Sequence, residues 1–463
     1  MRSAGVPLSS ARGRLVVAAT VLGSGVVFLE STVVNVALPS IAEELNLGMA
    51  GLQWILDGYL LTLSALILTG GSLGDAFGRG RMFVLGLVAF GVTSALAAFM
   101  PTATSLVIVR LLQGAAGALL VPNSLAVLET VFEGADRGRA IGQWAGWSAA
   151  STALGPLAGG WLIDATSWRW VFGVVAPIAF LAAALGMRAI SSAPEARARS
   201  TRIDVSGALL ATIGLAGITT ALIVGPIRSF TDPLVVVCGL GSVLVLGSFV
   251  FYEQRAEHAM LPLSMFRSRD FAGTNAATLF IYAALSGVFF LLMLQLQEGL
   301  GYSALQAGAS LLPINVLMVM LSPVAGRLAT RWGARWLVAA GAAFCAGGSL
   351  LFMTVKPGAA YTTTVLPAAS LFGFGLATLV APLTAAMMAS ADDSLKGVAS
   401  AFNNAVARVA GLLATVLIPL AAGIAGHADV QAVTTGFATA MAICAGLCVM
   451  GGMVAAAALS RKS

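Results

Sequence analysis

The sequence contains few charged residues and many apolar ones. Asp, Glu, Lys and Arg make up only 10% of the 463 residues, whereas an ordinary soluble domain contains about 25%. So few charges cannot cover the surface of a soluble fold, and 59% of the residues are hydrophobic. The 53 glycines follow no triplet repeat, which excludes a collagen. The composition predicts an all-α integral membrane protein and excludes disordered and nucleic-acid-binding proteins.

Cysteine and histidine are also scarce, which limits the chemistry that the chain can perform. The four cysteines all lie within apolar stretches: Cys238, Cys345, Cys444 and Cys448. The two histidines, His258 and His427, lie in polar breaks on opposite sides of the predicted membrane. No histidine or acid accompanies the cysteines, and no phosphate-binding loop is present. We therefore expect no metal, no cofactor and no enzymatic activity.

Long apolar runs account for most of the chain. A membrane-spanning helix needs about 20 predominantly apolar residues, and fourteen such runs follow one another between residues 15 and 459. The first run follows three arginines, as a signal peptide would, but it contains Glu30 and lacks a small-residue cleavage site. We expect all fourteen to be retained spans.

The basic residues predict the orientation of these spans, because cytoplasmic loops hold an excess of Lys and Arg. Twenty of the 25 Lys and Arg residues lie in one alternating set of breaks, together with both ends of the chain, and three lie in the other set. The pattern predicts a multi-pass protein of the plasma (inner) membrane with both termini in the cytoplasm.

Two breaks are longer and more polar than the others. They lie at 190–204 and 253–271 and enclose spans seven and eight. We therefore predict a six-helix bundle over 1–190, a cytoplasmic linker with two inserted helices over 191–260, and a second six-helix bundle over 261–463.

An internal repeat supports this division. The break after span two and the break after span ten share Gly, Leu and Gly at the same spacing, and basic residues follow in both. The matching residues are Gly71, Leu73 and Gly78 in the first break and Gly326, Leu328 and Gly333 in the second. Parallel repeats are typical of transporters built from two related bundles.

The first of these breaks resembles the loop motif of the major facilitator superfamily, and in particular of its fourteen-span drug:proton antiporters. The pattern Gly-x-Leu-x-Asp-x-x-Gly-Arg is present as Gly71, Leu73, Asp75, Gly78 and Arg79. Its glycines permit a tight turn, and Asp75 is suited to meet a helix N-terminus or a cation.

The charges of this loop predict a gate. Ala76 stands where the family usually has a basic residue, so that part of the charge network is weakened. Glu129, at the cytoplasmic end of span four, is the predicted partner of Arg79 or Arg81.

Three spans carry further motifs that resemble those antiporters. Span one has Glu30 where the family usually has Asp, and span four has Arg110 in the motif whose arginine is linked to proton coupling. Span five contains the antiporter-helix residues Gly155, Pro156, Gly159 and Gly160. The resemblance covers nearly the whole chain and implies the major facilitator fold.

Glu30, Arg110 and Asp57 are the predicted proton-coupling residues. A charged group at membrane depth is costly unless it is paired, solvated or neutralised. Structural alternatives remain for each: a hydrogen bond to a neighbouring helix for Glu30, an arginine that reaches the interface for Arg110, and an interfacial carboxylate for Asp57.

A second group of residues predicts a substrate cavity: Asn35, Trp144, Trp147, Asn403, Asn404 and Arg408. Arg408 lies about 16 Å into its span at 1.5 Å per residue, and Asn404 shares its helix face. Structural pairing between helices is the alternative for Arg408, and packing or interfacial positions are the alternative for the tryptophans.

The resemblance implies a proton-coupled antiporter that exports hydrophobic, often cationic, drugs or toxic compounds across the plasma membrane. The alternative is an exporter of one specific metabolite, siderophore or antibiotic on the same fold. The expected partners are a small-molecule substrate, protons and the lipid bilayer. Neither nucleic acid nor an obligate protein partner is expected.

Overall fold

The structure is a computed structural model that describes residues 6–190, 204–256, 263–391, 396–424 and 430–460. Within these ranges every regular element is a helix, as predicted. His258, His427 and most of the two long polar breaks lie outside the described residues.

Fourteen helical stretches cross the molecule. Thirteen of those described are long and apolar enough to span a membrane. The fourteenth, α5 (Gly134–Ala165), has 32 residues but is rich in Gly and Ala and carries charged residues in its first turns. It runs beside α1 (Ala11–Leu45) in the same direction: Asp136 accepts a hydrogen bond from the Leu8 backbone N–H (3.0 Å) near one end, and Gly159 packs on Val33 further along. Because α5 covers the same thickness as α1, the prediction of fourteen spans agrees with the structure.

The first six spans form one bundle. Besides α1 and α5 it comprises α2 (Met49–Phe77), α3 (Arg79–Ala98), α4 (Ala103–Val131), and α6 (Arg169–Gly173), which continues as α7 (Val175–Ala189). Small residues bring α2 and α4 together, since Gly74 lies against the Asn123 side chain and Asn123 Nδ2 donates to the Gly70 carbonyl (2.9 Å).

The last six spans form the second bundle. It comprises a 3-10 turn η1 (Leu263–Arg267), α10 (Arg269–Leu294) with its π-helical end η2 (Gln295–Gly299), α11 (Ala304–Ser310), α12 (Leu312–Trp332), α13 (Ala334–Phe352), α14 (Val365–Ala389), α15 (Lys396–Ala421) and α16 (Val430–Ala458). Here α11 and α12 together make one span.

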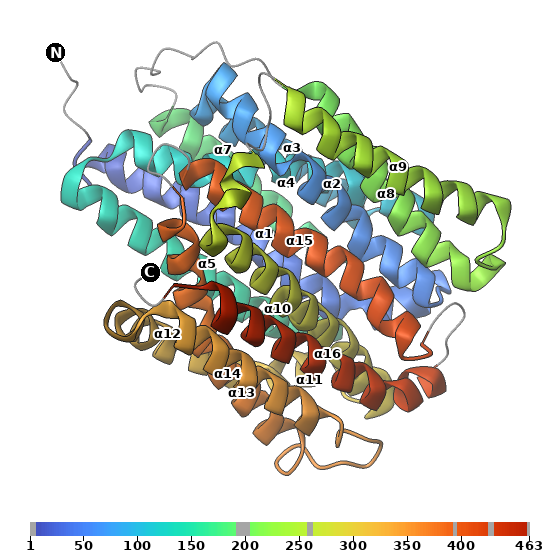
Figure 1. Ribbon diagram of the computed structural model, residues 1–463. Coiled ribbons are helices and arrows are strands. Elements are labelled where there is room, and N and C mark those ends of the chain that lie inside the picture. The colour runs from blue at the N-terminus through green and yellow to red at the C-terminus, as the bar shows by residue number, and fades with distance from the viewer. Residues whose placement is uncertain (1–5, 191–203, 257–262, 392–395, 425–429, 461–463) are drawn as a thin grey trace.

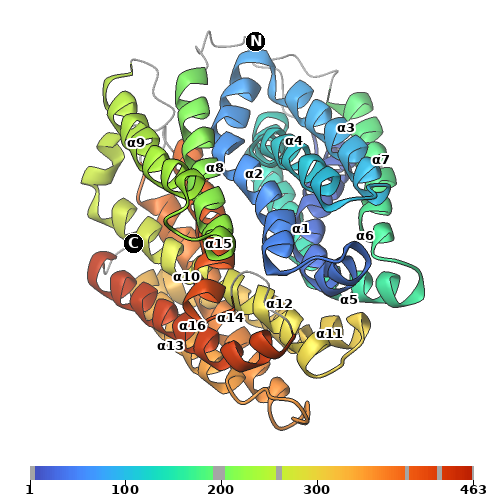
Figure 2. The ribbon, with the colours of Figure 1, turned by 90° about the vertical axis from the view of Figure 1, so that its right-hand side faces the viewer.

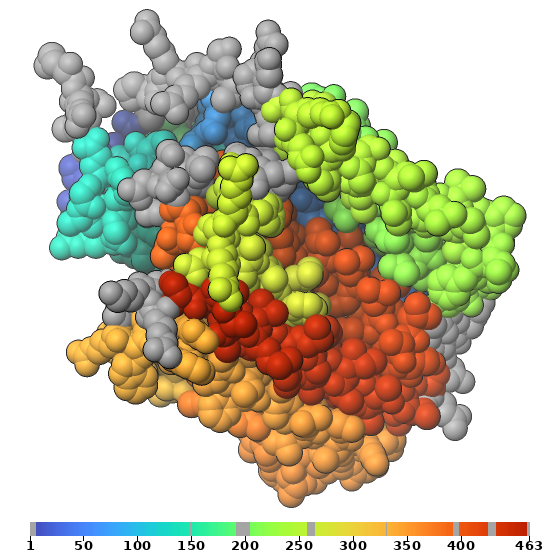
Figure 3. All heavy atoms as spheres, in the orientation of Figure 1, coloured from blue at the N-terminus to red at the C-terminus, as the bar shows by residue number. Residues whose placement is uncertain are grey.

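The two inserted helices lie together at one side of the molecule (Figures 1 and 2). They are α8 (Val205–Arg228) and α9 (Pro233–Arg255), and α8 contacts α2 and α15. The outer side of α9 is uncovered in Figure 3, and Leu244 there is 72% exposed. Because α9 is strongly apolar, this side faces lipid.

The predicted repeat is visible in the backbone. Gly78 lies between α2 and α3 with a φ of 100°, and Gly333 lies between α12 and α13 with a φ of 81°. Only glycine adopts such angles readily. The two loops therefore turn in the same way at equivalent positions of the two bundles, which supports the predicted duplication.

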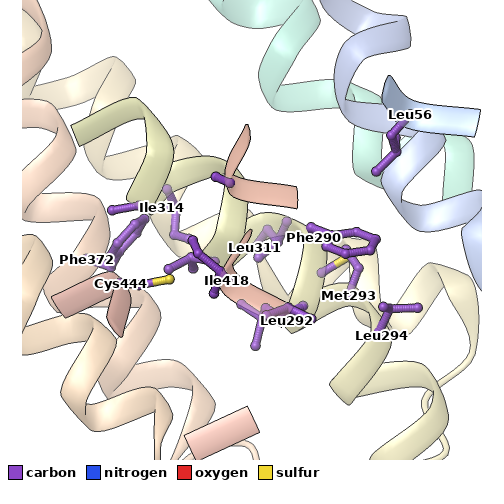
Figure 4. Close-up of a cluster of buried hydrophobic side chains, with 14 of the residues drawn as sticks. Leu56, Phe290, Leu292, Met293, Leu294, Leu311, Ile314, Phe372, Ile418 and Cys444 are labelled. Atoms are coloured by element: carbon purple, nitrogen blue, oxygen red, sulfur yellow. The ribbon is translucent and has the colours of Figure 1, made fainter. Parts of the chain in front are cut away.

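Among the described residues, the buried apolar cluster that joins the bundles lies near one of the two membrane faces. We call the face where α1 begins the N-terminal face and the other the opposite face. Near the opposite face one buried cluster includes Leu56 of α2 together with Met293 of α10 and Ile418 of α15 (Figure 4). Near the N-terminal face the corresponding cluster contains only residues of the first bundle, such as Phe83 and Leu128.

Candidate functional site

The predicted coupling residues meet in the interior of the first bundle. Arg110 of α4 donates a hydrogen bond from Nη1 to Glu30 Oε1 of α1, forming an ion pair. Glu30 is 0% exposed and Arg110 is 1% exposed. A buried pair of this kind is strongly disfavoured unless its remaining donors and acceptors are also satisfied.

Gln113 supplies that satisfaction, and its role was missing from the sequence-based prediction. It lies one turn after Arg110 on α4. Its Oε1 accepts from Arg110 Nη1 (2.7 Å), and its Nε2 donates to Glu30 Oε2 (2.7 Å) and to Ser94 Oγ of α3 (2.8 Å). Its spacing from Arg110 was the signal in the sequence that pointed to it.

Arg110 is held on its other sides by α2 and by aromatic rings. Its Nε donates to the Ile55 carbonyl (3.1 Å), and its guanidinium carbon lies 4.4 Å from the centre of the Tyr59 ring and 5.7 Å from that of Phe172. These contacts direct the side chain into the bundle. The alternative in which Arg110 reaches towards the interface is therefore wrong.

Asp57 is also buried, in the seam between the two bundles. It is 0% exposed, and its Oδ1 accepts from Thr415 Oγ1 of α15 (2.7 Å), while among the described residues its Oδ2 has no hydrogen-bond partner. Gln53, one turn earlier on α2, donates to the Thr415 carbonyl (3.0 Å). Burial rules out the interfacial alternative for Asp57.

Other polar contacts close the seam at the opposite face. Asp164, at the end of α5, accepts from Ser303 Oγ (2.6 Å) and from the backbone N–H groups of Ala304 and Leu305 (3.1 and 3.0 Å). The carboxylate thus caps the N-terminus of α11, a position that favours negative charge.

Two amides complete this closure. Gln297 Nε2 donates to the Val36 carbonyl of α1 (3.0 Å), and Asn315 Nδ2 donates to the Ala153 carbonyl of α5 (3.0 Å). Every hydrogen bond described between the bundles lies in the half of the molecule near the opposite face.

The antiporter-helix residues of α5 pack closely against α1 on one side of the helix and against α11 on another. Gly155 and Gly159 lie against Thr32 and Val33 of α1. On another side of the helix, Gly160 lies against the Ala304 carbonyl of α11, and the Pro156 carbonyl lies against Gly308. Side chains larger than hydrogen at these glycines would push the helices apart.

Towards the N-terminal face the same side of α5 faces open space. Gly142 and Gly146 lie about five and four helical turns before Gly160, so they are on the same side of α5. A Cβ built on either glycine would meet no atom within 4 Å. One turn below Asn315 on α12, Val319 is 58% exposed. The atoms of α5 and α12 stand apart at this face in Figure 3. We call this space between the bundles the central cleft.

The loop motif contains one predicted ion pair in a different form. Arg79 Nε donates to Asp75 Oδ1 (2.8 Å), one helical turn away. Arg79 therefore pairs with Asp75 instead of Glu129, which is exposed. The pairing of Glu129 with Arg81 stays a prediction. A Cβ built on Gly71 would lie 3.8 Å from Pro122 Cβ of α4, an ordinary contact distance, so a small side chain would fit there.

The polar residues of α15 separate into two roles. Asn403 Nδ2 donates to Asn275 Oδ1 (3.1 Å) and Thr278 Oγ1 (2.9 Å) of α10, so it pairs helices within the second bundle. Asn404 is exposed and Arg408 is half-buried. Among the described residues, Arg408 has no hydrogen bond or ion pair, so the structural-pairing alternative holds for Asn403 only.

The remaining cavity candidates are mostly engaged in local contacts. Trp144 Nε1 donates to Ser24 Oγ (2.8 Å), and its ring packs edge-on against Phe28. Asn35 Nδ2 donates to the Ser31 carbonyl of its own helix (3.2 Å). Trp147 is 61% exposed. The packing alternative therefore holds for Trp144.

Comparison with known proteins agrees with this arrangement. The model of the Major Facilitator Superfamily matches residues 20–415. The solved structure of a D-xylose–proton symporter superposes with a TM-score of 0.69 at 15% identity, covering 97% of this chain and 98% of that one. Two stacked bundles with a seam that opens at one face define a membrane transporter of this fold.

Two curated relatives are similar over most of their length. The tetracenomycin C resistance and export protein of Streptomyces glaucescens is 33% identical, over 89% of this chain and 77% of the relative. The puromycin resistance protein pur8 of Streptomyces alboniger is 33% identical, over 93% of this chain and 88% of the relative. The chain belongs to the major facilitator superfamily.

Proposed function

We propose that the protein exports hydrophobic drugs or other toxic compounds across the plasma membrane in exchange for protons. The observation that carries this proposal is the Glu30 carboxylate, which is fully buried and bonded to Arg110 and Gln113. A buried carboxylate with a single cationic partner is suited to bind and release a proton as its surroundings change. The resistance and export functions named for the two relatives support the cargo class.

The orientation follows from the basic residues. Twenty of the 25 Lys and Arg residues belong to breaks or chain ends at the N-terminal face, which makes that face cytoplasmic. The central cleft then opens to the cytoplasm, and the contacts of Asp164, Thr415 and Gln297 close the path to the outside. In this state the protein is ready to take up cargo from the cytoplasm.

Proton binding at Glu30 links the ion pair to the seam. A neutral carboxyl attracts Arg110 less than a carboxylate does, so protonation loosens the contact between α1 and α4. Val33 and Val36 follow Glu30 on α1, and they contact Gly159 of α5 and Gln297 of η2. A movement of α1 therefore reaches both the antiporter helix and the closed seam. Protonation from outside favours cargo release there, and deprotonation inside restores the ion pair.

A narrower cargo range is the second candidate. The names of the two relatives each specify one antibiotic, tetracenomycin C or puromycin. An exporter of one specific metabolite, siderophore or antibiotic would use the same fold and the same ion pair, acting as a transporter without an enzymatic step. A drug panel separates the two candidates by the number of compounds that are exported.

The test uses an efflux-deficient bacterial host that expresses wild-type protein or Glu30→Gln. Wild type should confer resistance to one or more compounds of a panel that includes puromycin and tetracenomycin C, and a protonophore should abolish that resistance. Glu30→Gln keeps the size of the side chain but cannot cycle a proton. Its resistance should fall to that of the empty host, while the matched surface variant Glu43→Gln should retain the wild-type level.

A second measurement examines coupling directly. Purified wild-type protein in weakly buffered detergent should release protons when cargo binds, and Glu30→Gln should not. Full proton release by Glu30→Gln would move the coupling site elsewhere, with Asp57 the next candidate because it too is a fully buried carboxylate.

A further inference from the structure

Arg408 lies where α15 parts from the first bundle. Asn404, Arg408, Gly411 and Thr415 are four, three and four residues apart, so they share one face of the helix. Thr415 bonds to α2, and Gly411 lies against Leu60 of α2, with 3.7 Å from its Cβ position to Leu60 Cδ1. Arg408 is the next residue on this face towards the N-terminal face, and it is half-buried. It lies at the closed end of the space between the bundles.

The guanidinium of Arg408 has unused hydrogen-bonding capacity. An arginine offers five N–H donors, yet among the described residues Arg408 makes no hydrogen bond and no ion pair. Arg110 shows the contrast, since it is bonded to Glu30, Gln113 and the Ile55 carbonyl. A cation at membrane depth is costly when it has no partner. The free N–H donors of Arg408 are therefore suited to a hydrogen-bond acceptor on a bound molecule.

The acidic groups of the interior are committed elsewhere. The Glu30 oxygens are bonded to Arg110 and Gln113. Asp57 is bonded to Thr415, which lies seven residues, about 10 Å, further along α15 than Arg408. The groups within electrostatic range of Arg408 include the phenols of Tyr59 and Tyr282, which supply no carboxylate. Asp57 lies deeper in the closed seam, so Arg408 is the charged group that the described part of α15 places nearest the open side of this space.

The side of α12 that meets α5 carries an apolar residue at the central cleft. Val319, one turn from the Asn315 contact with α5, is 58% exposed. An apolar wall combined with one accessible cation is complementary to an amphiphilic anion, because burial of its apolar part and a charge-assisted hydrogen bond act together. A cationic cargo that enters from the N-terminal face would meet the like charge of Arg408 before it reached Asp57 in the closed seam.

We infer that Arg408 is a cargo-binding residue that selects apolar compounds with an anionic oxygen, such as a carboxylate or an acidic phenol or enol. Asn404, one turn nearer the cytoplasm, offers a second polar contact on the same face. This inference rests on the proposed export function and narrows its cargo class. The site binds cargo only; Glu30 and Arg110 retain the proton-coupling role.

Binding by purified protein in detergent, without any ion gradient, tests the inference. Three probes share a pyrene ring and differ in charge: pyrenebutyrate, its methyl ester and a pyrenebutyl trimethylammonium cation. Wild type should bind pyrenebutyrate about ten- to a hundredfold more tightly than the cation. Arg408→Gln should lose this preference and bind the ester as wild type does. Arg228→Gln, which changes an exposed arginine at the end of α8, should behave like wild type.

Three results would overturn the inference: equal affinity of wild type for the carboxylate and the cation, an unchanged preference in Arg408→Gln, or an equal loss of all three probes in that variant. Arg408→Lys is the control for misfolding of the glutamine variant, because it keeps the positive charge and should keep the preference for pyrenebutyrate. Loss of that preference in Arg408→Lys would also count against the inference. The gradient-dependent transport of the same probes in proteoliposomes is read separately. Selective binding without proton-driven transport would contradict the proposed function and leave the assignment of Arg408 intact.

Discussion

The two halves of the membrane interior differ in how their polar groups are satisfied. Near the opposite face the bundles touch, and polar side chains such as Asp164 and Thr415 bond across the seam. Near the N-terminal face the bundles part, and Gly142 and Val319 face open space. The difference shows that the closed half is built from specific bonds between the bundles, while the open half keeps a surface that can bind cargo.

The two arginines within spans follow the same division. Arg110, in the half near the opposite face, is enclosed by Glu30, Gln113 and two aromatic rings. Arg408, in the other half, is accessible and has no described partner. The same residue type is thus fully bonded in one place, where we propose proton coupling, and without a described hydrogen bond in the other, where we propose cargo recognition.

The largest effect that this contrast predicts is on stability. Arg110→Ala leaves Glu30 buried without its cation, and loss of one partner of a buried pair costs about 3–5 kcal/mol. We expect a large fall in the free energy of unfolding, measured by denaturant or thermal unfolding in detergent. Glu30→Gln/Arg110→Ala should recover much of the loss, because the uncompensated charge is gone.

Arg408→Ala is the matched control for this prediction. It removes a cation without a described partner, so the free energy of unfolding should change by less than about 1 kcal/mol. A loss as large as that of Arg110→Ala would mean that Arg408 has a structural partner, and the contrast between the two arginines would fail.

Most of the fold could be predicted from the sequence. Span length and the distribution of basic residues depend on the membrane alone, so fourteen apolar runs were enough to predict the helices. The polar α5 was recovered because a run can be interrupted by Gly and Ser and still remain free of charge over most of its length. The repeat around Gly78 and Gly333 was visible because positive φ restricts both positions to glycine.

The site could be predicted only in part. Glu30 and Arg110 are recognisable because charge within a span needs a reason. The bond between Asp57 and Thr415 joins residues 358 positions apart in different bundles, a separation at which the sequence gives no sign of contact. Arg79 shows a further limit: the predicted topology does not decide which of two carboxylates, Asp75 or Glu129, pairs with it, and the structure has Asp75 there.

The second prediction compares two glycines on one side of α5. A Cβ at Gly160 would lie 2.7 Å from Leu305 Cα, whereas a Cβ at Gly142 would meet nothing within 4 Å. Gly160→Ala should therefore destabilise this closed seam by about 1–3 kcal/mol through overpacking, and Gly142→Ala should leave the free energy of unfolding within about 0.5 kcal/mol of wild type. Unfolding in detergent measures both, and equal effects would contradict the difference between the two halves.

The smallest predicted effect concerns the cap at the opposite face. Asp164→Ala removes the acceptor for Ser303, Ala304 and Leu305, and loss of a helix cap costs about 1 kcal/mol. Since these bonds join the bundles, the population open to the outside should rise about fivefold. A cysteine at Leu52, which is buried in the joint apolar cluster, reports this opening through its rate of labelling by a membrane-impermeant maleimide in a Cys238→Ser background.

Asp136→Ala provides the control at the other end of the same helix. Asp136 also accepts a backbone hydrogen bond, from Leu8 (3.0 Å), but that bond stays within the first bundle. Loss of this bond should leave the labelling rate of the Leu52 cysteine unchanged from that of the protein with both Asp136 and Asp164, because no contact across the seam is removed. Faster labelling in Asp136→Ala, or unchanged labelling in Asp164→Ala, would show that the cap of α11 does not hold the seam closed. The closure would then depend on the apolar cluster and on the bond between Asp57 and Thr415.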